Sequence, residues 1–107
     1  MNDAANTPGR HPAGAETRMG ILALAVKNRS EAAEAVNRLI SEYGELVIGR
    51  IGVPYRQKGL SVIAMIVEGT TDALGAFSGK LGMLPAVKSK MVLFDSTAPG
   101  QTDVQGS

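Results

Sequence analysis

Residues 19–27 read MGILALAVK, and residues 60–67 read LSVIAMIV. Both runs have the length of a strand, and in both the side chains are apolar on each of the two alternating faces. A strand with two apolar faces is covered on both sides, as happens at the centre of a sheet. We therefore predict that these two runs form the central strands.

A helix is predicted after each of these runs. Asn28 and Glu31 have the spacing of a capping box, and Gly44 supplies a stop. The second helix begins at Thr70 or Thr71 as the cap. The predicted buried stripes are Ala32, Val36, Leu39, Ile40 and Tyr43 in the first helix, and Leu74, Phe77 and Leu81 in the second.

Two further strands, residues 46–53 and 87–94, complete the pattern. Pro54 is expected to end the first of them, so that residues 54–59 form a hairpin loop. Arg50 interrupts this strand, and Lys88 and Lys90 interrupt the last one. Such cations are typical of edge strands, which need protection against stray pairing.

The order βαββαβ predicts an α+β, ferredoxin-like fold of the ACT type, with a four-stranded antiparallel sheet and two helices on one face. Residues 19–95 form this domain, whereas the polar ends, residues 1–18 and 96–107, are expected to be disordered tails.

Self-association is the expected means of stabilising so small a core. The chain has no cysteine, and its one histidine, His11, lies in the N-terminal tail, so neither a disulfide nor a structural metal site is predicted. Two helices cover one face of the sheet and leave the other uncovered. We expect a homo-oligomer, dimer or tetramer, formed sheet to sheet or edge to edge; the alternative is that the tails fold back over the sheet.

The net charge of the chain indicates which kinds of partner to expect. Eleven Lys and Arg against ten Asp and Glu give a formal net charge of +1, which argues against nucleic acid as the main partner. No signal peptide or membrane-length apolar stretch is present, so the sequence predicts a cytoplasmic protein without membrane contact.

The densest polar feature is the hairpin that contains Arg50, Tyr55, Arg56 and Lys58. Three cations and a tyrosine around a tight turn can bind a small carboxylate or phosphate compound. The alternative is a solvated turn. As a cation inside a strand, Arg50 needs a wet edge or a partner, such as Glu45 or a neighbouring subunit.

A second candidate segment is Ser78-Gly79-Lys80. It has part of a phosphate-binding P-loop, but the rest of that motif is missing, and the segment lies at the end of a helix. The structural interpretation is that Gly79 allows close approach of a neighbour and that Lys80 complements the helix dipole. Gly75 likewise suggests close packing or a ligand.

No catalytic constellation is present, because the core offers neither cysteine nor histidine to pair as nucleophile and base. We therefore expect no enzyme and no cofactor. The glycines of residues 47–52 are superficially similar to the clamp of a KH RNA-binding module, but Pro54 argues against the helix that such a module needs.

Two strings carry a family resemblance: residues 48–59, IGRIGVPYRQKG, and residues 78–85, SGKLGMLP, together with Leu74. With them, residues 18–94 resemble the iron-only hydrogenase system regulators, which are similar to the C-terminal ACT-like domain of nickel-responsive repressors. The resemblance implies the ferredoxin-like fold, oligomerisation through the sheet and a link to iron-only hydrogenase assembly or expression.

Two features of the nickel-responsive repressors are not carried over. Their metal site uses histidines and a cysteine, and this core has neither. Their DNA-binding segment is longer and less polar than residues 1–18. The leading hypothesis is a regulatory module that binds a small anionic ligand or a protein partner through Arg50, Tyr55, Arg56 and Lys58 and through Ser78 to Lys80; the alternatives are a regulator that binds DNA directly and a small enzyme.

Overall fold

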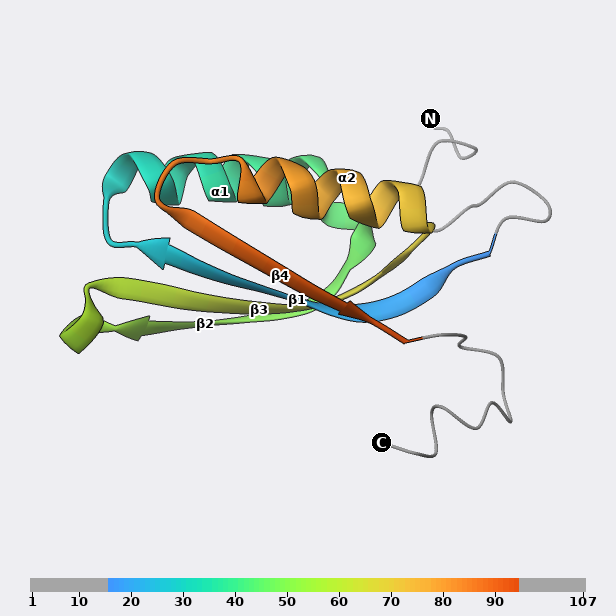
Figure 1. Cartoon of the computed structure of the whole chain (residues 1–107), viewed down its shortest axis with the longest axis horizontal. Coiled ribbons are helices and arrows are strands. Elements are labelled where there is room, and N and C mark those ends of the chain that lie inside the picture. Colours follow the sequence, from blue (N-terminus) through green and yellow to red (C-terminus); the bar gives the residue numbers. More distant parts are fainter. Residues whose placement is uncertain (1–15, 95–107) are drawn as a thin grey trace.

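The computed structural model describes residues 16–94 and has the predicted element order βαββαβ (Figure 1). The predicted tail 96–107 and most of the tail 1–18 lie outside the described residues. The elements are β1 (Arg18–Lys27), α1 (Ser30–Glu42), the 3-10 turn η2 (Gly44–Leu46), β2 (Val47–Tyr55), the 3-10 turn η3 (Arg56–Lys58), β3 (Leu60–Gly69), α2 (Thr71–Gly82) and β4 (Val87–Leu93).

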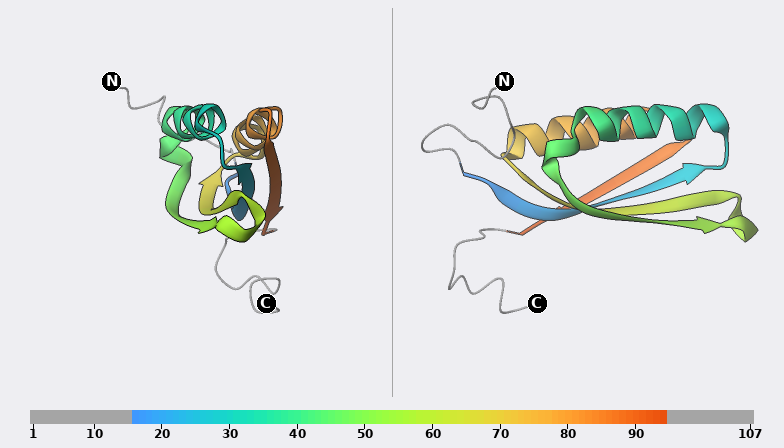
Figure 2. Two further views of the ribbon diagram at one scale, coloured as in Figure 1. Left: turned by 90° about the vertical axis from the view of Figure 1, so that its left-hand side faces the viewer. Right: turned by 180° about the vertical axis from the view of Figure 1, so that it is seen from behind.

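The four strands form one antiparallel sheet in the order β2-β3-β1-β4. Both helices lie on the same face of this sheet, with α1 toward the β2 side and α2 toward the β4 side (Figure 2). The predicted ferredoxin-like topology is confirmed. The two doubly apolar strands are indeed central, and the two strands interrupted by cations are the edges.

The hydrophobic core fills the space between the helices and the sheet. Leu22 and Leu24 of β1 and Met65 and Val67 of β3 are at most 1% exposed, and Phe77 of α2 is fully buried above them. No polar or charged residue among residues 16–94 is buried. Burial of apolar surface therefore holds the two layers together.

The two helix starts differ from each other. Thr70 caps α2 as predicted, because its Oγ1 accepts a hydrogen bond of 3.1 Å from the Ala73 amide. The predicted Asn28 cap of α1 is wrong: Arg29 occupies the N-cap position, and its side chain makes no capping bond. The Asn28 amide instead donates to the Gly59 carbonyl at 3.0 Å, which ties the end of β1 to the hairpin.

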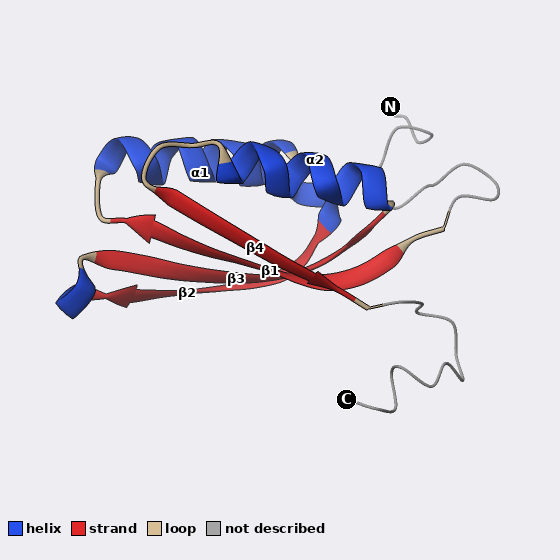
Figure 3. Ribbon diagram, viewed as in Figure 1, coloured by secondary structure: helices blue, strands red, loops and turns tan. Residues whose placement is uncertain are grey.

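The prediction that Pro54 ends the second strand is also wrong, because β2 continues to Tyr55. Pro54 pairs with Ser61 inside the ladder. An edge strand tolerates proline because no neighbouring strand lies on its outer side. A missing N–H on that side therefore costs no hydrogen bond of the sheet. The turn itself is η3, the small helical segment at the tip of the hairpin in Figure 3, and Gly59 closes it with a φ of 66°.

A β-bulge in β2 determines which side chains face the helices. Val47 pairs with Val67, but Gly49 already pairs with Ile66, so the strand carries one extra residue at Ile48. Residues directly opposite each other in an antiparallel pair share a face. After the bulge, Arg50 therefore lies on the helix-covered face with its partner Met65.

No helix among the described residues is long and apolar enough to cross a membrane.

Candidate functional site

A groove of about 320 Å³ lies between α1 and the β2–β3 hairpin, on the helix-covered side of the sheet. Its apolar part includes Val26, Val36 and Ile63. Its polar side chains come from four elements or their ends: Asn28, Asn37, Arg50 and Ser61. A concave surface with an apolar floor and a few polar groups is the usual form of a small-molecule site.

Arg50 gives this groove its chemical character. The side chain is exposed, so its charge remains solvated in the free protein. A guanidinium group presents a planar fork of donors that matches a carboxylate or a phosphate. Asn28 and Asn37 also line the groove, and their carboxamides supply further donors and acceptors. The groove thus has the groups needed to hold a small anion.

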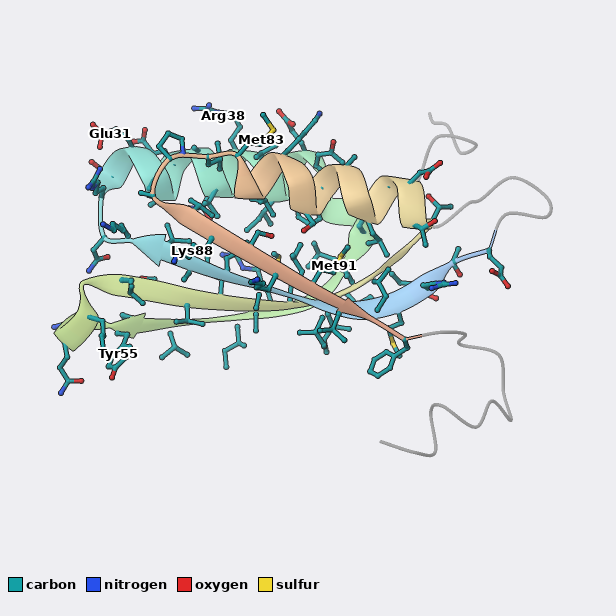
Figure 4. All side chains as sticks on the ribbon, viewed as in Figure 1. Glu31, Arg38, Tyr55, Met83, Lys88 and Met91 are labelled. Carbon is teal, nitrogen blue, oxygen red and sulfur yellow. The ribbon has the colours of Figure 1, made fainter. Side chains whose placement is uncertain are left out.

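The other three hairpin residues of the predicted site lie elsewhere. Tyr55 pairs with Leu60 and points away from the helices, below the sheet in Figure 4. Arg56 and Lys58 lie in η3 at the tip of the hairpin and are exposed. Of the four predicted residues, Arg50 lines the groove, and the remaining three surround the tip.

The second predicted segment lies over the opposite edge of the sheet. Ser78 Oγ is 3.1 Å from Ser89 Oγ of β4, a hydrogen bond that links α2 to this edge strand. Arg50 belongs to β2, and the two central strands lie between β2 and β4. Within one chain the hairpin residues and the segment Ser78 to Lys80 are therefore not brought together.

Lys80 contacts the end of α1. Its Nζ lies over the ring of Tyr43, 5.5 Å from the centroid, and the Tyr43 ring stacks on Phe77 at 4.8 Å. Hydrogen bonding to Tyr43 and attraction to its charged form raise the pKa of Lys80 above the ordinary value of 10.5. This contact joins the two helices and accounts for Lys80 without a ligand.

The two glycines of α2 do not serve close packing within the chain. A Cβ at Gly75 or Gly79 would meet no atom within 4 Å, apart from the helix's own nearby backbone. The expectation that Gly79 allows a neighbour to approach is wrong for a single chain, and so is the expectation of close packing at Gly75. Both residues are exposed.

The face of the sheet away from the helices, called the open face from here on, is apolar and uncovered by the described residues (Figures 1 and 2). An apolar hollow of about 370 Å³ lies on it beside Ala64 and Gly49. The large aliphatic side chains of the open face are 38 to 65% exposed, and they are Ile21, Ile51, Val53, Val62, Ile66 and Val92.

The groove residues Asn28, Asn37 and Ser61 were not identified from the sequence. They come from separate elements, and no spacing pattern links them before the chain folds. The bulge at Ile48 changes which residues of β2 face the helices, and it places Arg50 in the groove. The sequence pattern does not show this change either. Across residues 16–94, no three His, Cys, Asp or Glu side chains gather closely enough to hold a metal ion.

Comparison with known proteins adds family information to this geometry. The sequence model of the family described as "TM1266-like: Iron-only hydrogenase system regulator, putative" matches residues 18–91. The solved structure of the uncharacterized protein TM1266 from Thermotoga maritima is 34% identical, with a TM-score of 0.73. The alignment covers 75% of this chain and 100% of that one. No curated protein matches the chain significantly.

Proposed function

Since the chain belongs to the TM1266-like family of iron-only hydrogenase system regulators, we propose that it is a cytoplasmic regulatory module that binds a small anionic compound and catalyses no reaction. The groove between α1 and the β2–β3 hairpin is the proposed binding site. The observation that carries this proposal is the position of Arg50, a strand arginine that the bulge turns toward an apolar floor and two asparagine side chains.

The lining favours an anion with an apolar part over a bare inorganic ion. Arg50 is suited to a carboxylate or phosphate group, and Asn28 and Asn37 are suited to a neighbouring polar group. Val36 and Ile63 offer apolar contact to the remainder of the molecule. The volume of about 320 Å³ is at the lower end of the usual range for small-molecule pockets, which favours a compact metabolite.

Ligand binding can control the hairpin, because groove residues lie on both of its strands. Pro54 on β2 and Ser61 on β3 pair with each other and line the groove. The Asn28 amide fixes the hairpin at Gly59, next to the exposed turn η3. A bound anion would hold α1 and the hairpin in one relative position. A protein of the hydrogenase system would then bind the hairpin tip at η3 only when the hairpin is held in that position.

The first experiment is native mass spectrometry of the freshly purified protein, which detects a retained small anion. The second is a titration with phenyl phosphate, an anion with an apolar part, followed by amide chemical shifts, on the wild type and on Arg50→Ala. We expect shifts at Asn28, Asn37 and Ser61, and a loss of at least tenfold in affinity for Arg50→Ala, because a charge-assisted bidentate contact is removed.

Arg38→Ala is the matched control. Arg38 is an exposed arginine on α1 that points away from the sheet, as Figure 4 shows, and it does not line the groove. It has the same charge and lies one residue from Asn37. Equal affinity in wild type and Arg50→Ala, or an equal loss in both variants, would refute the groove as the anion site.

A further inference from the structure

The open face has the size of a protein interface. Four strands about 4.8 Å apart, with up to ten residues at about 3.4 Å each, give roughly 600 Å² in projection. A specific interface buries about 800 Å² on each partner. The projected area is about three quarters of this typical value and lies at the lower end of the range for specific interfaces, so the rim of the face has to contribute as well.

The edges of the sheet are less suited to contact. On the β2 edge, Pro54 removes a donor and the bulge at Ile48 breaks the regular ladder. On the β4 edge, Lys88 and Lys90 are exposed and carry like charges. These features are known to prevent pairing between edge strands. Association through the open face is therefore favoured over extension of the sheet from one chain to another.

The charges on the open face are separated along the strands. Glu68 pairs with Met19 at one end of the β1–β3 ladder, and Lys27 pairs with Leu60 at the other end. Met19 and Lys27 are eight residue steps apart along β1, which corresponds to about 27 Å. Lys88 and Lys90, opposite Ala25 and Ala23, extend the positive half along β4. One half of the open face is thus positive, and the far end carries a carboxylate.

This separation selects one of two ways to stack two identical sheets. Ala23 lies midway between Met19 and Lys27, and its partner Ala64 lies midway between Leu60 and Glu68. A two-fold axis that crosses the strands near this alanine pair reverses the strands of the second copy. A two-fold axis along the strands leaves their direction unchanged and stacks the positive halves on each other.

We propose that the open face binds the open face of a second copy of this chain with reversed strands, so that Glu68 of each copy lies against Lys27 of the other. The contact forms twice by symmetry, at the two ends of the interface. Stacked sheets lie about 10 Å apart, a gap that a lysine and a glutamate side chain can span from opposite sides. The apolar side chains between these ends supply the buried area. This interface does not depend on the anion site in the groove.

A charge swap tests the pairing. Glu68→Lys and Lys27→Glu each replace two attractive contacts by two repulsive ones, and we expect each to weaken dimerisation at least tenfold. The double variant Lys27→Glu/Glu68→Lys restores the attraction and should recover the wild-type dissociation constant. Glu34→Lys, an equal charge change on the exposed side of α1, serves as the control. Sedimentation equilibrium at fixed ionic strength measures the dissociation constants of the wild type and of the four variants.

Introduced cysteines test the orientation, since the chain has no cysteine of its own. Stacked sheets lie too far apart for a direct disulfide, so a bismaleimide with a span of about 10 Å is used to join the cysteines. With reversed strands, it should link a mixture of Lys27→Cys and Glu68→Cys chains, whereas either variant alone should stay uncrosslinked. With strands in the same direction, Lys27→Cys alone would crosslink. That result would overturn the proposed orientation, and a wild-type monomer at all concentrations would overturn the interface.

Discussion

Gly75→Ala and Gly79→Ala should each stabilise the protein. Both positions lie in the interior of α2, and an added Cβ would meet nothing within 4 Å. Neither glycine has a positive φ, so alanine fits the existing backbone. Glycine in a helix costs about 1 kcal/mol relative to alanine, because it loses more conformational freedom on folding. We therefore expect each substitution to raise the free energy of unfolding by about 1 kcal/mol.

Thermal unfolding followed by circular dichroism measures this effect. For a domain of this size, about 1 kcal/mol corresponds to a rise in Tm of about 4–8 °C. All variants must be compared at one protein concentration, because self-association stabilises the folded state by mass action. The double variant should gain about twice as much as either single one.

Gly20→Ala is the matched contrast, with the same chemical change at a crowded position. A Cβ there would lie 2.6 Å from Leu93 Cδ2 and would press on the Val92 carbonyl oxygen of β4. We expect a loss of about 1–3 kcal/mol, typical of overpacking. A lower Tm for Gly75→Ala or Gly79→Ala would refute the reasoning, since it would require a neighbour at α2 that the single chain does not supply.

Three further predictions concern the core, a helix cap and a titrating contact. Phe77→Ala should cost about 3–5 kcal/mol in urea denaturation, because it empties a fully buried site and removes the stacking on Tyr43; a loss below 1 kcal/mol would contradict this. Thr70→Ala should cost about 1 kcal/mol through the lost capping bond, whereas Thr71→Ala should change stability much less, and equal losses would contradict the assignment of the cap. Lys80→Met should lower Tm at neutral pH. Because the pKa of Lys80 is raised in the folded state, its contribution to stability is fully present below pH 10.5 and is lost as the pH rises through the folded pKa. The difference in Tm between Lys80→Met and wild type should therefore narrow above pH 10.5. A constant difference in Tm up to pH 12 would contradict the contact with Tyr43.

The topology was predictable because it depends on features that short windows of sequence contain. The apolar runs 19–27 and 60–67 have no polar face, and this identified the central strands before any contact was known. Local chemistry was less reliable at the element ends. Thr70 caps its helix as predicted, but the equally plausible Asn28 does not, because the turn after β1 places Arg29 at the cap position and commits the Asn28 amide to the hairpin.

The candidate site was predictable only in part. Arg50 was identified as a cation that needed a special environment, and it lines the groove. Its neighbours Asn37 and Ser61 carried no local signal, since they meet it only after α1 packs on the sheet. The segment Ser78 to Lys80 was grouped with the hairpin by composition, whereas the strand order separates them by the width of the sheet.

The bulge at Ile48 makes the surface chemistry of this domain sensitive to chain length. By simple alternation from Val47, Ile51 and Val53 would belong to the interior and Arg50 to the outer face; the extra residue exchanges these roles. Loss of one residue at this point would then act like a simultaneous replacement of every side chain from Gly49 to Tyr55. Two related chains that differ only by one inserted or deleted residue before Arg50 would therefore differ in what they bind.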